Sequence, residues 1–238
     1  MLNAIIHGKA GRIELENDTD SISWRQVYKK HEDLLTAAFF SRFTYLSSLL
    51  QHRLLKQWLG GVGDFTGFKG IDYWPRYELN KHDDRDFVEP DLLLRFTDRD
   101  VLVEVKPPEG GDQYIEQWQL EIEGYYAQEQ SVKPLYFLAI GRVSNILADL
   151  DVEAIQIKHP TFQKASSIEW KPIASQLHKL HLSSELDAQD NRVVEDMGKA
   201  LSLYGIRAHD LNWENLQKLS AENPLNLNVI EAWPSKAS

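Results

Sequence analysis

The chain has 238 residues, with 26 lysines and arginines against 36 aspartates and glutamates, and it contains no cysteine. The absence of cysteine excludes a disulfide framework, a cysteine-ligated zinc site and a thiol nucleophile. The formal net charge of −10 argues against a nonspecific nucleic-acid binder, because such proteins need a basic surface. The acidity is uneven: residues 1–106 carry 15 basic and 17 acidic side chains, a net of −2, and the rest carries 11 and 19, a net of −8.

The composition predicts an ordered globular protein. Hydrophobic residues make up 42% of the chain and aromatic residues 11%, with only 9 prolines and 13 glycines. No apolar run approaches the ~18 residues of a membrane span. Glycine and charge come too early at the start of the chain for a secretory signal, so we expect a cytoplasmic protein with no membrane partner.

The N-terminal third predicts a short strand or hairpin followed by helices. Residues 1–20 alternate loosely and end in a polar run. From Ser23, which forms a capping-box pattern with Gln26, apolar residues recur at helical spacing until Gly60-Gly61. One helix over 23–59 would be unusually long, so we expect two helices with a joint near residues 40–44.

The central part of the chain predicts strands and one helix. The expected elements are, in order, a loop over 60–70, a strand over 71–79, a polar turn over 80–84, a hairpin with strands 91–96 and 101–106, a helix from the N-cap Asp112 to about 130, and a strand over 134–140. Pro107-Pro108 ends the second hairpin strand. These elements predict an α/β fold with a mixed sheet flanked by helices.

The remainder predicts a mainly helical C-terminal extension. The expected elements are a short helix over 144–150, a strand over 154–157 and helices over 170–180, 183–204 and 210–221. We therefore expect two parts, a core over residues 1–142 and an extension over residues 143–238.

Three polar side chains in the predicted hairpin carry the candidate chemistry. Glu104 lies between Val103 and Val105 in a strand of core composition, and a buried charge without a partner is strongly unfavourable. A divalent metal bridging Asp91 and Glu104 would neutralise it, and Mg²⁺ prefers carboxylates together with water and phosphate. Lys106, on the same face as Glu104, would help to deprotonate or orient the attacking water.

At these positions the sequence resembles the PD-(D/E)XK superfamily of restriction-endonuclease-like nucleases. Pro90-Asp91, a gap of twelve residues and then Glu104-Val105-Lys106 match its motif. The resemblance covers roughly residues 23–142. It implies a restriction-endonuclease-like core, a metal held by Asp91 and Glu104, and Lys106 as the residue that assists the water.

The resemblance also implies further site residues. Many members add an acidic residue from the helix before the sheet, for which Glu32 is the first candidate and Asp33 the second. Some place glutamine and tyrosine on the helix after the motif, where Gln117, Glu121 and Tyr125 lie at i, i+4 and i+8 here. The metal is expected to be Mg²⁺, with Mn²⁺ possible, because the candidate ligands are oxygen atoms.

Taken singly, these residues have ordinary structural explanations. Asp91 could be a turn residue, Glu104 and Lys106 a solvated charge pair on an edge strand, and Glu32 a surface charge on a helix. His82 with Asp83 and Asp84 is better explained as a charged turn than as a metal cluster. His178 and His181 lack a placed acidic partner, and no serine lies in a G-x-S-x-G motif.

The predicted helical region over residues 21–59 carries six basic and two acidic side chains, a net of +4, which suits contact with a DNA backbone. Its candidate contacts are Lys29, Lys30 and Arg42, with Gln117 from the later helix.

We expect a Mg²⁺-dependent DNA endonuclease, in a prokaryotic phage-defence or mobile-element setting by resemblance. The acidic C-terminal part suits a protein partner or a dimer mate. The alternative is a catalytically silent subunit of the same fold that acts as a DNA- or protein-binding scaffold in a complex.

Overall fold

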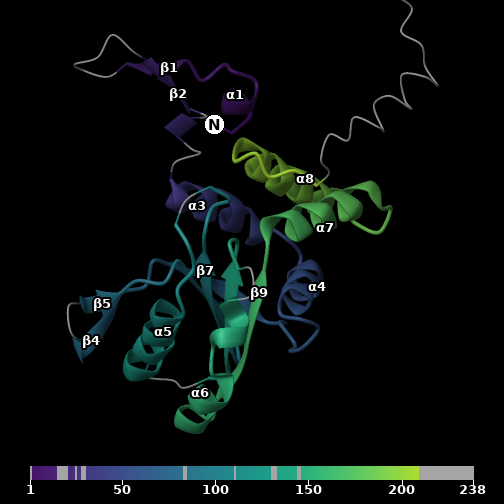
Figure 1. Ribbon diagram of the computed structural model, residues 1–238. Coiled ribbons are helices and arrows are strands. Elements are labelled where there is room, and N and C mark those ends of the chain that lie inside the picture. The colour runs from purple at the N-terminus through teal and green to yellow at the C-terminus, as the bar shows by residue number, and fades with distance from the viewer. Residues whose placement is uncertain are drawn as a thin grey trace, which may run out of the picture. The chain divides into compact units, whose positions relative to one another are not determined.

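A five-stranded mixed sheet forms the centre of the computed structural model, which describes residues 2–14, 21–24, 26–27, 31–82, 85–109, 111–129, 133–143 and 146–208. The strands are β3 (Phe68–Tyr73), β6 (Leu92–Phe96), β7 (Asp100–Val105), β8 (Leu135–Ile140) and β9 (Phe162–Ile168), in that spatial order. β3, β6 and β7 are antiparallel neighbours, whereas β7, β8 and β9 run parallel. The α/β class and the mixed sheet are therefore confirmed (Figure 1).

The parallel half of the sheet depends on two helical crossovers. Helix α5 (Ile115–Gln128) connects β7 to β8, and the 3₁₀ helix η1 (Ile146–Asp149) with α6 (Val152–Lys158) connects β8 to β9. Parallel strands need such crossovers, which cover the sheet and favour strands that are apolar on both faces. Every residue of β7 and β8 is buried accordingly.

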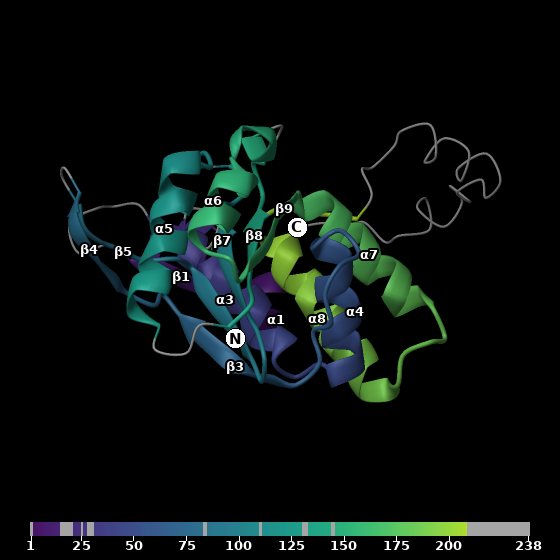
Figure 2. The ribbon, with the colours of Figure 1, turned by 90° about the horizontal axis from the view of Figure 1, so that it is seen from below.

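Helices cover both faces of the sheet. Figure 2 shows α5 and α6 on one face, and on the other α3 (Glu32–Phe43), α4 (Ser48–Trp58), α7 (Trp170–Leu182) and α8 (Ala188–Leu203). Alternate strand residues separate the two cores: Val103 and Val105 pack with the α3, α4, α7 and α8 side chains, and Leu102 packs with α5. Glu104 and Lys106 follow Leu102 on the α5 side of the sheet, as the period of two predicts.

Shorter elements lie outside this sheet. Helix α1 (Leu2–Ile6) precedes the antiparallel pair β1 (Arg12–Glu14) and β2 (Ser21–Ser23), and β4 (Tyr77–His82) pairs with β5 (Arg85–Val88). The hairpin expected within residues 1–20 thus begins later and ends at Ser23, after a helical turn. The capping box is present, since the Ser23 backbone N–H donates to Gln26 Oε1 over 2.9 Å and the Gln26 N–H donates to Ser23 Oγ over 3.3 Å.

Several predicted boundaries were wrong. The expected strand over 71–79 is divided between β3 and β4, because Trp74 adopts a left-handed φ of 49° before Pro75. The two expected helices are present as α3 and α4, but α3 begins at Glu32 and their joint, at residues 44–47, lies slightly after the expected 40–44. Asp112 does not cap α5, whose N-cap is Tyr114; its carboxylate binds Arg142 instead. The strand predicted over 154–157 lies within α6.

The expected division after residue 142 does not separate two parts of the fold. The strand β9 lies beyond it and belongs to the central sheet, and α7 and α8 supply one of the helical layers. Residues 1–208 form one compact unit. The helix predicted over 210–221 lies outside the described residues.

None of the described helices is both long enough and apolar enough to cross a membrane.

Candidate active site

Asp91 and Glu104 are brought together by the β6–β7 hairpin. Leu92 pairs with Val103, so the residue before Leu92 lies next to the residue after Val103. Asp91 is fixed at both ends: its carbonyl accepts the Trp74 N–H over 3.0 Å, and its Oδ2 accepts the Val105 N–H over 2.7 Å. The side chain of Asp91 therefore bonds the neighbouring strand as well as facing Glu104.

Glu32 reaches the same place from a different element. It opens helix α3, with Asp33 beside it in the first turn. Unpaired N–H groups give a helix N-terminus a partial positive charge, which stabilises nearby carboxylates. The first turn of α3 therefore both supplies a third carboxylate and favours the negative charge of the group.

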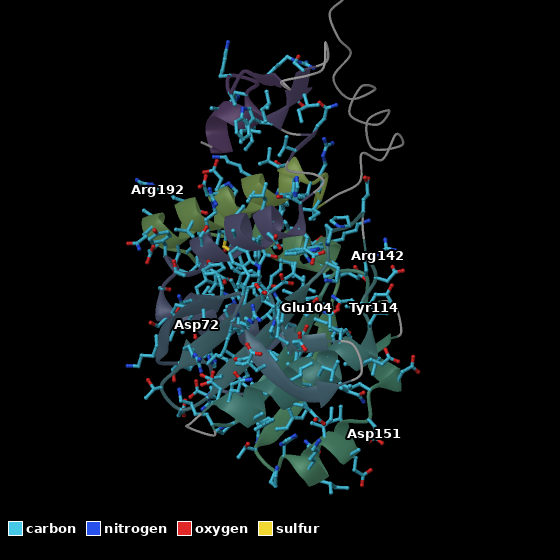
Figure 3. The ribbon with its side chains drawn as sticks, turned by 90° about the vertical axis from the view of Figure 1, so that its left-hand side faces the viewer. Asp72, Glu104, Tyr114, Arg142, Asp151 and Arg192 are labelled. Carbon is cyan, nitrogen blue, oxygen red and sulfur yellow. The ribbon has the colours of Figure 1, made fainter. Side chains whose placement is uncertain are left out.

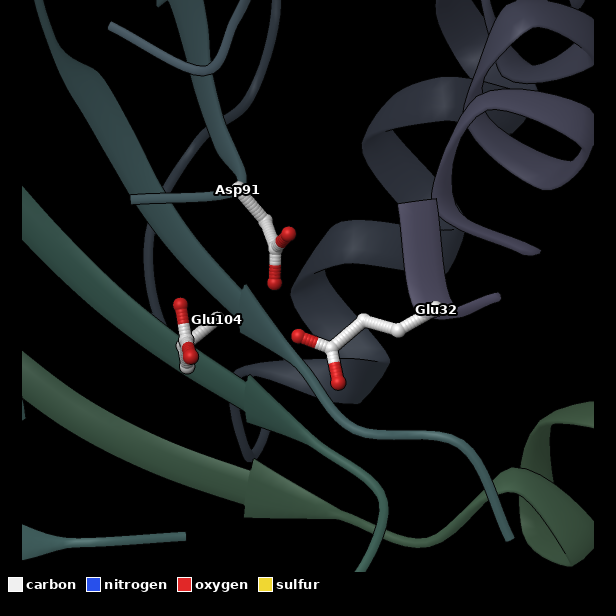
Figure 4. Close-up of side chains that lie close together, drawn as sticks. All are labelled: Glu32, Asp91 and Glu104. Atoms are coloured by element: carbon white, nitrogen blue, oxygen red, sulfur yellow. The ribbon is translucent and has the colours of Figure 1, made fainter. Parts of the chain in front are cut away.

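Glu32, Asp91 and Glu104 form a carboxylate cluster. One oxygen of each lies within 4.8 Å of an oxygen of the others, and Figure 4 shows the three groups turned toward a common space. In the side view of Figure 3, Glu104 lies between Asp72 on one side and Tyr114 and Arg142 on the other. Three convergent carboxylate oxygens are the donor set that suits a hard divalent cation such as Mg²⁺.

Lys106 supplies the one ammonium group that binds this cluster among the described residues. Its Nζ donates to Glu104 Oε1 over 2.7 Å and to Glu32 Oε1 over 2.9 Å. Its backbone is held as firmly: the N–H donates to Ile140 O over 2.8 Å and the carbonyl accepts Trp170 Nε1–H over 2.8 Å. No local pattern in the sequence signals this contact of Trp170, because the residue lies 64 positions further along the chain.

Burial shapes the ionisation of the cluster. It raises the pKa of Asp91 well above its usual value, with repulsion from Glu104 adding to the effect. Burial also raises the pKa of Glu104, although the Lys106 ammonium opposes it. For Lys106, burial lowers the pKa, but the carboxylates of Glu104 and Glu32 outweigh burial and leave it above its usual value. Lys106 is therefore a protonated donor.

Helix α5 adds Gln117 and Glu121 to the site. Gln117 Nε2 donates to Glu104 Oε1 over 2.9 Å and to Glu121 Oε1 over 2.8 Å. Burial raises the pKa of Glu121 well above its usual value, and repulsion from Glu104 adds to it. Tyr125, the next residue at this spacing, lies elsewhere and donates its hydroxyl to Asp100 Oδ2 over 2.9 Å.

The cluster opens into a cleft of about 350 Å³. Its wall is formed by the following residues: Glu32, Asp33, Trp74, Glu89, Asp91, Glu104, Lys106 and Gln117. The sequence did not indicate Trp74, and its period of two places Glu89 on the same strand face as Asp91. Nothing in the local pattern shows that the β4–β5 hairpin begins and ends beside the cleft. Asp33 lines the cleft, whereas Glu32 is the one that joins the cluster.

The remaining candidates are not at this cleft or cannot be placed. Lys29 and Lys30 lie outside the described residues, as do the side chain of His82 and the residues Asp83 and Asp84. Arg42 pairs with Asp196 over 3.0 Å and ties α3 to α8. His181 Nδ1 lies 2.9 Å from Asn191 Oδ1, a contact between α7 and α8.

Comparison with known proteins adds one relative. No family model and no solved structure matches the chain. The chain is 28% identical over 247 residues to the uncharacterized protein PM0110 of Pasteurella multocida (strain Pm70). This match covers 98% of the chain and 93% of the relative. The name of the relative assigns no activity.

Proposed function

We propose that the chain is a Mg²⁺-dependent nuclease that hydrolyses phosphodiester bonds in DNA. The observation that carries the proposal is the convergence of Glu32, Asp91 and Glu104 within 4.8 Å, beside the Lys106 ammonium. Four residues that are up to 74 positions apart in the sequence meet at one cleft. Isolated surface charges do not require such convergence.

The site residues fit a divalent cation. At full ionisation three carboxylates face a single ammonium, and Asp91 and Glu104 are only 5% and 2% exposed. Buried negative charge of this kind is costly unless a cation or protons neutralise it. Glu32, Asp91 and Glu104 would hold Mg²⁺ or Mn²⁺, which supplies electrostatic stabilisation of the phosphate and activation of water when bound.

The protonated Lys106 has a distinct role. Its ammonium donates to Glu104 and Glu32, whose carboxylates raise its pKa, so it is a hydrogen-bond donor and a positive charge beside the cluster. It fixes Glu104 and Glu32 in the ground state, and its ammonium can donate to a phosphate oxygen that gains charge during hydrolysis. We therefore assign to Lys106 the orientation of the reactants, through its hydrogen bonds to Glu104 and Glu32.

The order of elements supports the same proposal. In chain order the chain has helix α3 with Glu32, edge strand β3, the β6–β7 hairpin with its motif residues, helix α5 and parallel strand β8. Helix α4 lies between α3 and β3, and the β4–β5 pair lies between β3 and β6. This order is the one expected of a restriction-endonuclease-like core. A prokaryotic phage-defence or mobile-element setting, and a protein partner or dimer mate, are proposed by resemblance and composition alone.

Plasmid cleavage in Mg²⁺ tests the function. The wild-type chain is expected to nick or linearise plasmid DNA, whereas Asp91→Ala and Lys106→Ala are expected to lose more than about 100-fold of the rate, the scale of losing one charge-stabilising group. Glu116→Ala, an exposed carboxylate at the start of α5, is the matched control and should cleave like wild type.

Absence of cleavage in every protein, with Mg²⁺ or Mn²⁺ and with single-stranded as well as duplex DNA, would contradict the proposal. Retained DNA binding in that case would favour the silent scaffold. Cleavage that survives in Asp91→Ala would instead indicate a contaminating nuclease.

A further inference from the structure

Glu121 is a fourth carboxyl group near the site, with an unusual environment. It is 0% exposed on helix α5, and its Oε2 has no hydrogen-bond partner among the described residues. Its Oε1 accepts one bond, from Gln117 Nε2 over 2.8 Å. Buried polar atoms are almost always paired, so a carboxyl group kept here with one partner calls for an explanation.

Gln117 links this buried group to the carboxylate cluster. An amide nitrogen has two hydrogens, and both are used: Gln117 Nε2 donates to Glu121 Oε1 and, over 2.9 Å, to Glu104 Oε1. Glu104 Oε1 also accepts from Lys106 Nζ over 2.7 Å. Two side-chain donors therefore converge on one oxygen of Glu104, and no described side chain donates to the other oxygen, Oε2.

Helix α5 is a rigid support for this arrangement. Trp118, Ile122 and Tyr125 on the same helix are buried against the sheet. Glu121 lies among them, one turn after Gln117, so its carboxyl group has a fixed position from which to hold the amide. Ligand orientation in metal sites commonly depends on such supporting residues.

We propose that Glu121 is a positioning residue, which holds the Gln117 amide so that the Glu104 carboxylate keeps the orientation needed to bind a divalent cation. The inference rests on the proposed function, because Glu104 is one of the three residues proposed to hold the metal. It adds a residue that contacts neither the cation nor the substrate. Its effect passes through Gln117.

Calorimetric titration with Mn²⁺ tests the proposal without relying on activity. Glu121→Met keeps the length of the side chain and removes the acceptor, and it is expected to weaken Mn²⁺ binding by roughly 10-fold or more. Glu121→Gln keeps an oxygen that accepts the Gln117 N–H and is expected to bind within about twofold of wild type. Glu116→Met, an exposed change on the same helix, is the control.

A double-mutant cycle separates positioning from a general structural effect. If Glu121 acts through Gln117, the chain carrying both Gln117→Met and Glu121→Met binds Mn²⁺ no more weakly than Gln117→Met alone. Additive losses would overturn the proposal, as would wild-type affinity in Glu121→Met. Gln117→Met changes only a half-buried side chain, so wild-type affinity in this variant overturns the proposal even if Glu121→Met does not fold.

The same titration distinguishes the two proposals. Mn²⁺ binding that Asp91→Ala abolishes but Glu121→Met leaves intact would overturn the positioning role and keep the proposed metal site. A wild-type chain that binds no Mn²⁺ would overturn the metal site and the positioning role together.

Discussion

Three carboxyl groups in the cleft or next to it are held away from water. Asp91, Glu104 and Glu121 are 5%, 2% and 0% exposed, and burial raises the pKa of each of them. Lys106 compensates Glu104 and Glu32, while Glu121 has only the neutral amide of Gln117. At the scale of single residues, therefore, the free energy of unfolding of the metal-free protein depends on pH.

The sign of this dependence follows for Glu121. A carboxyl group whose pKa rises on folding binds protons more tightly in the folded chain than in the unfolded one. The contribution of Glu121 to stability is therefore lost as the pH rises from 4.5, the ordinary pKa of a glutamate, through the higher pKa that Glu121 has in the folded chain. Glu121→Gln removes the ionisation, so in EDTA it is expected to raise the melting temperature more at about pH 8 than at about pH 5.

Thermal unfolding at the two pH values measures this difference. A gain of 1 kcal/mol raises the melting temperature of a chain of this size by about 2–4 °C. Glu116→Gln, which removes an exposed carboxylate of the same helix, is the control. An identical shift for Glu121→Gln at both pH values would mean that Glu121 ionises in the folded protein as it does in the unfolded chain.

At the scale of elements, the ends of β7 and β8 fix the position of Lys106. Gly141, directly after β8, has a φ of 80°, and a Cβ there would overlap the Lys106 carbonyl oxygen and approach Trp170 Nε1 to 2.8 Å. Both neighbours belong to the contact in which Trp170 donates to Lys106 O. A glycine is needed here for its backbone conformation and for the close approach of two chain segments.

Gly141→Ala is expected to displace Lys106, which directly follows β7. The strain of a positive φ alone costs about 1 kcal/mol, and Gly61 offers the matched control, with a φ of 83° and no atom within 4 Å of the place that a Cβ would take. Gly141→Ala should therefore lower the melting temperature more than Gly61→Ala and should also weaken Mn²⁺ binding. Equal effects of the two variants on stability would show that the close approach carries no extra cost.

The elements that the sequence predicted well are those with a strong local pattern. The β6–β7 hairpin has two apolar runs around a polar turn, and its register places Asp91 beside Glu104. Strand β9 was missed because it is an edge strand with mixed burial and a polar composition, Phe-Gln-Lys-Ala-Ser-Ser-Ile. Such a strand is recognised by its pairing with β8, a contact that local sequence does not encode.

In the candidate site, too, a local pattern predicted some residues, whereas the position of others depends on packing. Asp91, Glu104 and Lys106 lie in one hairpin, so the spacing of the motif was sufficient to predict that they meet. Glu32 was a candidate because the resemblance implies an acidic residue from the helix before the sheet, and its contact with Lys106 depends on the packing of α3 against the sheet. Glu121 was noticed only for its spacing from Gln117, because its complete burial arises from the packing of α5.

At the scale of the whole molecule, α7 and α8 complete the core over the sheet and over α3 and α4. The contacts are polar as well as apolar: Trp58 Nε1 donates to Gln176 Oε1 over 2.8 Å, and the Ser47 N–H donates to Asp190 Oδ1 over 2.7 Å. Trp170 at the start of α7 bonds the backbone of Lys106. The part of the chain after residue 142 thus helps to fix the position of Lys106 in the cleft.

A chain shortened to residues 1–142 is therefore expected not to fold. The apolar side chains that α7 and α8 bury in the core include Trp170, Ile173, Leu177, Leu180, Val194, Met197, Leu201 and Leu203. Each buried side chain of this size contributes about 1.5–3 kcal/mol, so the joint loss of these eight is as large as the whole ~5–15 kcal/mol by which domains are stable, or larger. Near-ultraviolet circular dichroism and thermal unfolding measure the result, with a chain ending at Ala208 as the control that keeps the compact unit of residues 1–208. A cooperative transition in the 1–142 chain would show that the sheet with α3, α4 and α5 is stable without β9 and the α7–α8 layer.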